Sequence, residues 1–219
     1  MKRRGRFVVL EGLDGAGTTT QAARLARALR RGGHRVVLPR EPSAGPVGVL
    51  LRQALSSRGR QGGNATLSDA TLALLFAADR LDHVASTVEP GLAAGAVVIS
   101  DRYVLSSFAY QGRVLERAWV EALNSQAPAP DLTLFLEVRP KVAAVRRHLR
   151  GGPAERFDDA RTQRAVARAY KAVVSRHARA HHIKRLDGEL GVEDVASHVH
   201  AAVQAHLVRG LARPARRVR

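Results

Sequence analysis

The segment that most constrains the fold is a glycine-rich turn at residues 12–19, with the sequence GLDGAGTT. The apolar run RFVVLE at residues 6–11 predicts a buried strand before it, and residues 18–31 carry apolar side chains at helical spacing after it. Such a turn lets several backbone N–H groups point at one anion, and the helix N-terminus adds partial positive charge. The spacing predicts a phosphate-binding loop formed by Gly12, Leu13, Asp14, Gly15, Ala16, Gly17, Thr18 and Thr19.

One position of this loop departs from the pattern G-x-x-x-x-G-K-[ST], because Thr18 stands where the pattern has lysine. That lysine places positive charge on the transferring phosphates, and losing one charge-assisted hydrogen bond costs about 1.5–3 kcal/mol. Two explanations are open: an arginine from elsewhere supplies the charge, or the protein binds nucleotide and catalyses poorly. Our hypothesis is the first, because the rest of the predicted site is complete.

The remainder of the chain alternates short apolar runs with longer helical patterns. Strands are predicted at residues 6–11, 35–38, 96–100, 132–138 and 182–186, and a long helix is predicted from a cap at residues 68–69 to about residue 95. Alternating strands and helices indicate an α/β fold, here a three-layer P-loop fold with a five-stranded parallel sheet flanked by helices. We expect one domain over residues 1–208 and a basic tail over residues 209–219, with ligands bound at the carboxyl ends of the strands.

Composition narrows the class of protein. The chain of 219 residues has no cysteine and no apolar run approaching the ~20 residues of a membrane span, so we expect a cytoplasmic protein without disulfides or membrane contact. Its net charge is +17, and 32 of its 36 basic residues are arginines. No aromatic residues interleave with the arginines at the two ends, so we do not expect nucleic acid as a partner.

Further sequence blocks follow the loop in order: REP at 40–42, FAADR at 76–80, SDRY at 100–103, SSFAYQG at 106–112 and PDLTLFLEV at 130–138. Together with EGLDGAG and TTTQ they resemble the signature set of thymidylate kinases over about residues 6–160. The resemblance implies transfer of the γ-phosphoryl of ATP to dTMP with Mg²⁺, and a homodimer. The departure at Thr18 puts catalytic power in doubt more than the fold or the ligand class.

The acceptor side of the site is predicted from these blocks. Arg40 and Arg102 both follow strands, where two guanidinium groups can grip a monophosphate. The resemblance implies that Phe76 stacks on thymine, that Arg80 bonds its carbonyl edge, and that Tyr110 lies under the sugar and disfavours a 2′-hydroxyl. The complete predicted substrate-binding set is Arg40, Glu41, Phe76, Arg80, Arg102, Tyr103, Ser107, Tyr110 and Gln111.

The donor side is predicted around the loop. Thr19 and Asp101 are expected to hold Mg²⁺, which keeps much of its hydration shell, and Asp14 is expected to orient the acceptor phosphate or the metal. Some thymidylate kinases carry an arginine inside the phosphate loop, but this loop does not. We therefore expect catalytic arginines from a lid at about residues 146–158, where Arg146, Arg150 and Arg156 flank a Gly-Gly-Pro break.

Two other functions stay open at this stage. One is a related kinase that acts on another deoxynucleotide or on a nucleoside. The other is a non-catalytic nucleotide-binding regulator built on the same scaffold, for which Thr18 is the main support.

Overall fold

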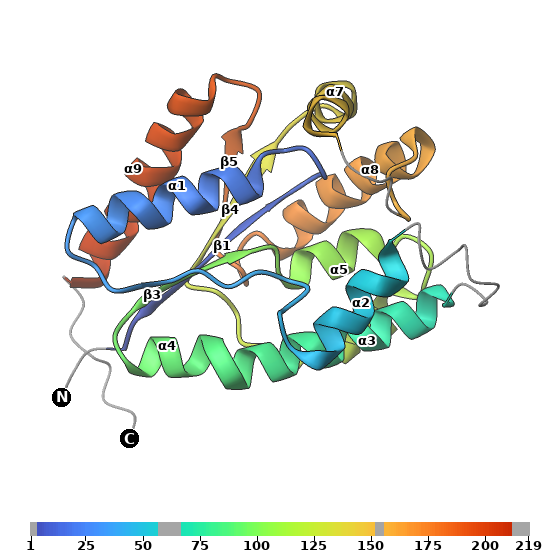
Figure 1. Cartoon of the computed structure of the whole chain (residues 1–219), viewed down its shortest axis with the longest axis horizontal. Helices are drawn as coiled ribbons and strands as arrows, with labels where there is room; N and C mark the ends of the chain where they lie inside the picture. The colour runs from blue at the N-terminus through green and yellow to red at the C-terminus, as the bar shows by residue number, and fades with distance from the viewer. Residues whose placement is uncertain (1–3, 57–66, 152–155, 212–219) are drawn as a thin grey trace.

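The fold is built on a five-stranded parallel sheet. The computed structural model describes residues 4–56, 67–151 and 156–211, and its strands lie in the order β2-β3-β1-β4-β5 (Figure 1). Their bounds are β1 Arg6–Gly12, β2 Val36–Val37, β3 Val97–Asp101, β4 Leu132–Glu137 and β5 Ile183–Asp187. Every pair is parallel, which confirms the predicted fold class. The predicted strand at residues 35–38 is shorter than expected, with only two residues in the sheet.

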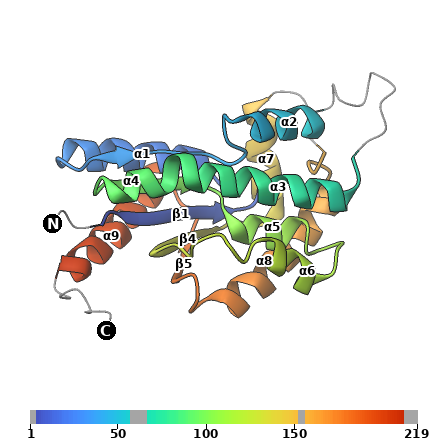
Figure 2. The ribbon, with the colours of Figure 1, turned by 90° about the horizontal axis from the view of Figure 1, so that it is seen from below.

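Helices cover both faces of this sheet. Helices α1 (Thr18–Arg31) and α9 (Val192–Leu211) pack against each other and on the sheet, whereas α4 (Glu89–Ala93) packs on β3 and α5 (Val104–Tyr110) on β1 (Figures 1 and 2). The other helices are α2 (Pro46–Leu55), α3 (Asp69–His83), α6 (Arg117–Leu123), α7 (Pro140–Arg150) and α8 (Ala160–His177). The predicted long helix from residue 68 is therefore a composite of α3, a π-helical turn (η2, Val84–Val88) and α4.

The π turn has a local cause. The backbone N–H of Glu89 donates to the carbonyl of Val84, five residues back, and Pro90 follows directly. Because proline has no N–H and its ring crowds the carbonyl four residues earlier, the regular helical register does not pass through this point. The start of α3 agrees with the sequence, since the Ser68 hydroxyl accepts from the N–H of Thr71.

The core consists of the inner strands and the helix faces against them. Phe7, Leu10, Ile99 and Leu134 are fully buried, in keeping with strands that are covered on both faces. No helix among the described residues is long and apolar enough to cross a membrane. Helix α9 runs to Leu211 and so includes the first three residues of the predicted basic tail, 209–211. The rest of that tail and residues 152–155 of the predicted lid lie outside the described residues.

Candidate active site

The phosphate loop joins the carboxyl end of β1 to the N-terminus of α1, as predicted. Gly15 and Gly17 have φ angles of 88° and 95°, a left-handed conformation that favours glycine. Within the described part of the chain, the backbone N–H groups of Gly15, Gly17 and Thr18 have no protein acceptor. With the positive end of the α1 dipole behind them, these groups form a site for an anion.

Helix α7 packs directly against this loop. A Cβ atom on Gly15 would lie 2.3 Å from the carbonyl oxygen of Ala143, so only glycine allows this approach. Arg147 donates from Nη1 to the carbonyl oxygen of Asp14 at 2.6 Å, and its Nε lies 3.6 Å from the carboxylate of Asp158. The first helix of the predicted lid is therefore fixed to the phosphate loop through packing and a hydrogen bond.

Thr19 and Asp101 lie together at the mouth of the loop. The Thr19 hydroxyl donates to Asp101 Oδ2 at 2.5 Å, and Asp101 Oδ1 is buried without a hydrogen-bond partner among the described residues. A hydroxyl and a carboxylate are the oxygen ligands that Mg²⁺ prefers, and two protein ligands suffice because this ion retains several waters. The described residues contain no larger cluster of metal-binding side chains. The residues present therefore fit Mg²⁺.

Arg102 has a strained backbone that is held from two sides. Its φ angle is 71°, which is uncommon for a residue other than glycine. Its N–H donates to the carbonyl of Leu10 at 3.0 Å, and the Ser100 hydroxyl donates to its carbonyl at 2.7 Å. This conformation directs the guanidinium to the phosphate loop, where it donates to the Gly12 carbonyl at 2.8 Å and to Asp14 Oδ1 at 2.5 Å.

Asp14 is an acceptor for three side chains. Besides Arg102 it accepts from the Tyr110 hydroxyl at 2.7 Å and from Gln163 Nε2 at 3.1 Å, both on Oδ2. Burial by itself would raise the pKa of Asp14, but Arg102 and the two hydrogen bonds outweigh it, with Arg147 adding to them, and lower the pKa below its ordinary value. Asp14 is therefore held as a carboxylate.

Glu11 is a second carboxyl beneath the loop, and it is fully buried. It accepts from the backbone N–H groups of Tyr103 and Ser106 and from the hydroxyls of Ser106 and Tyr170. Burial raises the pKa of Glu11, against the effect of these donors and of Arg102. Glu11 thus fixes the start of α5 relative to β1.

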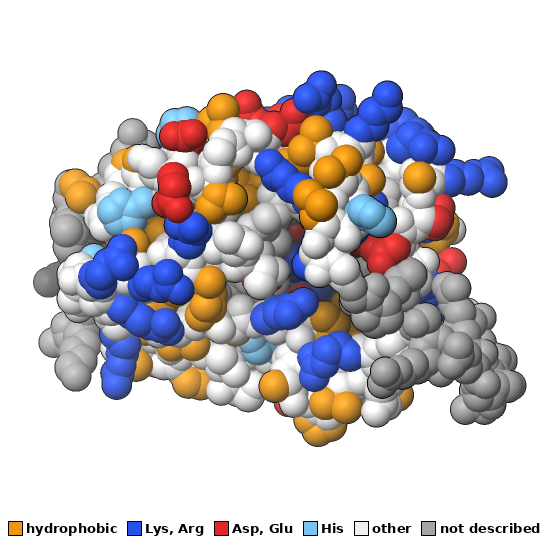
Figure 3. Space-filling model, turned by 45° about the horizontal axis from the view of Figure 1, so that its top comes forward, with side chains coloured by type: hydrophobic (Ala, Val, Ile, Leu, Met, Phe, Trp, Pro, Cys, Tyr) orange, Lys and Arg blue, Asp and Glu red, His pale blue; other side chains and the backbone are white. Residues whose placement is uncertain are grey.

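Two adjoining hollows open at the carboxyl ends of the strands, where Figure 3 shows basic side chains around the hollowed middle of the surface. The first, which we call the loop hollow, has a volume of about 700 Å³ and is lined by the phosphate loop, the end of α7 and the segment after β5. The second, the Phe76 hollow, has about 120 Å³ and lies between α3, α5 and the residues after β2. Four side chains line both hollows: Asp14, Arg40, Glu41 and Arg102.

Arg40 is the exposed member of this shared border. Residues 39–41 run beside the end of β3, where Arg40 bridges to Asp101 through the backbone and the N–H of Glu41 donates to the Asp101 carbonyl at 3.4 Å. Among the described residues the Arg40 guanidinium makes no hydrogen bond or ion pair. It is available to an anion at the junction of the hollows.

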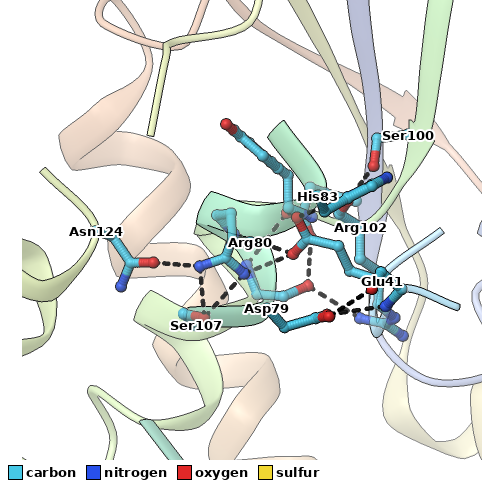
Figure 4. A network of polar contacts seen from close by, with 12 residues as sticks. Glu41, Asp79, Arg80, His83, Ser100, Arg102, Ser107 and Asn124 are labelled. Atoms are coloured by element: carbon cyan, nitrogen blue, oxygen red, sulfur yellow. Dashed lines mark hydrogen bonds and ion pairs between the residues drawn. The ribbon is translucent and has the colours of Figure 1, made fainter. Parts of the chain in front are cut away.

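Arg80, in contrast, is almost completely enclosed, with 1% of its surface exposed. All three of its guanidinium nitrogens donate, to Glu41 Oε2 at 2.7 and 3.0 Å, to the Ser107 hydroxyl at 3.1 and 3.2 Å, and to Asn124 Oδ1 (Figure 4). A buried ion pair is tolerated when its hydrogen bonds are satisfied in this way. Arg80 therefore forms the fixed floor of the Phe76 hollow.

The other predicted base-binding residues also line the Phe76 hollow, with one exception. Phe76 is half-buried, and the Gln111 side chain forms no hydrogen bond with the described residues, so both can contact a ligand. Tyr110 lies edge-on to Phe157 at 5.5 Å. Tyr103 does not line either hollow; it is 1% exposed, and its ring packs against Phe7 and Arg80.

The three predicted lid arginines lie in different places. Arg146 donates to the carbonyl of Gly188 at 2.7 Å and lines the loop hollow. Arg150 is exposed at the end of α7 and also lines the loop hollow. Arg156 lines neither hollow, because it donates to the carbonyl of Leu67 at 2.6 Å and to Asp69 at 2.9 Å, which joins it to the start of α3. The structure does not bring Arg156 to the phosphate loop, and its catalytic role stays a prediction.

The sequence did not single out four residues of the site, namely Glu11, Asn124, Gln163 and Tyr170. Arg147 also flanks the Gly-Gly-Pro break of the predicted lid, but its hydrogen bond to the phosphate loop was not predicted. Glu11 could have been found as a charged residue at the end of an otherwise apolar strand. Asn124 directly follows α6, Gln163 and Tyr170 lie on α8, and no motif in the sequence connects these three to the loop.

A P-loop at the carboxyl end of the central strand of a parallel sheet, with a second hollow beside it, defines a nucleotide-binding phosphotransferase scaffold. The comparisons with known proteins specify the family. The thymidylate kinase family model matches residues 10–199. A probable thymidylate kinase of Thermococcus gammatolerans is 36% identical over 94% of this chain and all of the relative. A thymidylate kinase of Ruegeria pomeroyi is 37% identical over 95% of this chain and 99% of the relative. The chain belongs to the thymidylate kinase family.

Proposed function

We propose that this protein is a thymidylate kinase, which transfers the γ-phosphoryl of ATP to dTMP and releases dTDP and ADP. The observation that carries the proposal is the shared border of the two hollows. Asp14, Arg40, Glu41 and Arg102 line both, so phosphates that enter from the two sides meet there. Family membership supplies the identity of the two nucleotides.

In this proposal the loop hollow takes the ATP phosphates on the N–H groups of the phosphate loop, which have no acceptor in the described part of the chain. The Phe76 hollow takes dTMP, with thymine against Phe76, its edge at Gln111 and the Arg80 network, and its phosphate on Arg40 and Arg102. In-line phosphoryl transfer requires mainly positioning and neutralisation of charge, and these groups provide both.

Thr19 and Asp101 would hold Mg²⁺. When bound, the ion neutralises charge on the ATP phosphates. The chain's own part is to hold Asp101 through the Thr19 hydroxyl and to leave Asp101 Oδ1 without a protein partner among the described residues.

A homodimer and a cytoplasmic location belong to the same proposal, as the family resemblance implies. Helix α3 supports the dimer, because Leu74 and Leu81 are 50% and 40% exposed and lie seven residues apart on one side of the helix. Sedimentation equilibrium of the wild type and of Leu74→Asp with Leu81→Asp tests it, and a monomeric wild type would refute it.

The activity is tested by ADP release in a coupled assay with ATP, Mg²⁺ and one acceptor at a time: dTMP, dUMP, dCMP, UMP or thymidine. We expect dTMP to have the highest kcat/KM of the five. A higher value for another acceptor would assign the protein to the related kinase that acts on that compound.

Thr18 specifically favours one second function, a nucleotide-binding regulator without turnover. Its mark would be tight ATP binding, measured by calorimetry, together with no ADP release for any acceptor. Turnover with dTMP excludes it.

A further inference from the structure

Thr18 leaves the phosphate loop without the cation that its pattern contains, and the structure shows which side chains surround the gap. Thr18 is 5% exposed, lines the loop hollow, and lies at the first position of α1. As γ-phosphoryl transfer proceeds, the bond from the γ-phosphorus to the β,γ-bridging oxygen breaks and a bond to an acceptor phosphate oxygen forms. Negative charge then moves onto the β-phosphate of ADP, where a cation stabilises it.

The loop hollow has four arginines in its lining: Arg40, Arg102, Arg146 and Arg150. Arg40 and Arg102 also line the Phe76 hollow, which places them between donor and acceptor. The charge of Arg102 is moreover offset by Asp14, whose carboxylate lies 2.5 Å from its Nη2. These two arginines therefore do not replace the loop lysine, whose charge acts on the donor phosphates alone.

Arg146 and Arg150 line the loop hollow alone. Arg146 is held by the carbonyl oxygens of Gly188 at 2.7 Å and Glu189 at 3.5 Å, so its guanidinium is committed to the segment after β5. Arg150 makes no hydrogen bond or ion pair with the described residues. Among those residues it is the one unpartnered cation that lines the donor side and not the acceptor side.

The attachment of α7 lets an exposed arginine act at a defined place. Gly15 packs on the Ala143 carbonyl, and Arg147 donates to the Asp14 carbonyl, so the helix that ends at Arg150 is docked on the phosphate loop itself. The backbone of Arg150, at the end of this helix, therefore has a fixed position relative to the loop. Its guanidinium has no partner among the described residues and can bind a phosphate.

We propose that Arg150 supplies to the donor phosphates the positive charge that the loop lacks at Thr18. This inference rests on the proposed function and names the residue that allows phosphoryl transfer although the loop has no lysine at Thr18. Arg150 contacts the β- and γ-phosphates of bound ATP and is a catalytic residue in this protein.

A double-mutant cycle of Thr18→Lys and Arg150→Ala tests the proposal, because two groups that perform one task are not additive. In the wild-type background, Arg150→Ala lowers kcat about 100-fold, the size of loss typical for one charge-stabilising donor. In the Thr18→Lys background the same change lowers kcat by less than about fivefold, since a loop lysine then carries the charge. The KM for dTMP changes by less than about twofold in either background, because Arg150 does not line the Phe76 hollow.

Two further variants serve as controls. Arg164→Ala removes an exposed arginine on α8 that lines neither hollow, and it leaves kcat unchanged. Arg150→Lys keeps the charge and retains more activity than Arg150→Ala.

The results that overturn the proposal are distinct from failure of the function. An equal loss from Arg150→Ala in both backgrounds gives Arg150 a lid role that does not replace the lysine, and a loss no larger than that of Arg164→Ala gives it no role. A silent wild type with an active Thr18→Lys variant shows that no group substitutes for the lysine, although the acceptor site works. Silence of both with dTMP refutes the thymidylate kinase assignment itself.

Discussion

The Phe76 hollow and the loop hollow lie side by side but are built by opposite means. The floor of the Phe76 hollow is a closed network in which Arg80 is 1% exposed and all its nitrogens donate. The loop hollow is lined by backbone N–H groups that have no acceptor among the described residues and by Arg150, an exposed cation at a helix end. In the proposed function, the floor of the base site is therefore fixed before a ligand arrives, whereas part of the positive charge for the donor phosphates comes from a side chain without a partner among the described residues.

The largest effect is expected where the hollows meet. Arg102→Ala removes a guanidinium that donates to the Gly12 carbonyl and to Asp14 and that lines both hollows. We expect kcat/KM for dTMP to fall about 1,000-fold, equivalent to about 4 kcal/mol. Steady-state kinetics with Arg164→Ala as the control measures this loss. A loss below tenfold would contradict the role of Arg102 at the junction.

Loss of the Arg80 network should lower the free energy of unfolding and not only the rate of catalysis. Arg80→Ala leaves the Glu41 carboxylate buried without its charged partner, which we expect to lower the free energy of unfolding by about 3 kcal/mol. Urea unfolding monitored by circular dichroism measures it. Arg150→Ala should leave the unfolding midpoint where it is, because Arg150 has no partner among the described residues. Equal destabilisation by the two variants would remove the contrast between the hollows.

Removal of the aromatic face should affect the acceptor and leave the donor unchanged. We expect Phe76→Ala to raise the KM for dTMP about 20-fold, as for the loss of one base–aromatic stack, with the KM for ATP unaltered. Phe76→Leu, which keeps apolar volume, should have a smaller effect. A change in the KM for ATP as large as that for dTMP would show that the hollows are not separate.

The smallest effect concerns pH and Asp14. Folding lowers the pKa of Asp14 below its ordinary value of 3.8, so its ionised form stabilises the folded state above that pH. This contribution is lost as the pH falls through the folded-state pKa. We expect Asp14→Asn to cost about 1 kcal/mol of unfolding free energy at pH 7, because the carboxylate is partly exposed. The difference in unfolding free energy between the variant and the wild type should shrink between pH 4 and pH 3. A difference that grows in this range would contradict a lowered pKa of Asp14.

The sequence was sufficient to predict the parts of the molecule that depend on local patterns. The phosphate loop, the position of α1, the strand–helix alternation and the cap at Ser68 follow from glycine spacing and periodicity, and the structure agrees with them. The π turn before Pro90 was not predicted, because periodicity alone does not show where a proline shifts the register.

The contacts between distant elements could not be predicted. Arg146 and Arg150 share a helix face in sequence, yet one is held by the Gly188 carbonyl and the other has no partner among the described residues. Arg156 binds at the start of α3 because the chain folds back there, and Tyr103 is in the core although it follows Arg102 directly. Such positions depend on packing, which a single sequence does not specify.

The most direct test of this account is the affinity for dTMP without ATP, measured by calorimetry on the wild type and on Thr18→Lys. We predict that dTMP binds to both proteins in the absence of ATP. The two dissociation constants should agree within about twofold, because Thr18 lines only the loop hollow. Absence of dTMP binding until a donor nucleotide is added, or a tenfold change caused by Thr18→Lys, would contradict an acceptor site complete in itself.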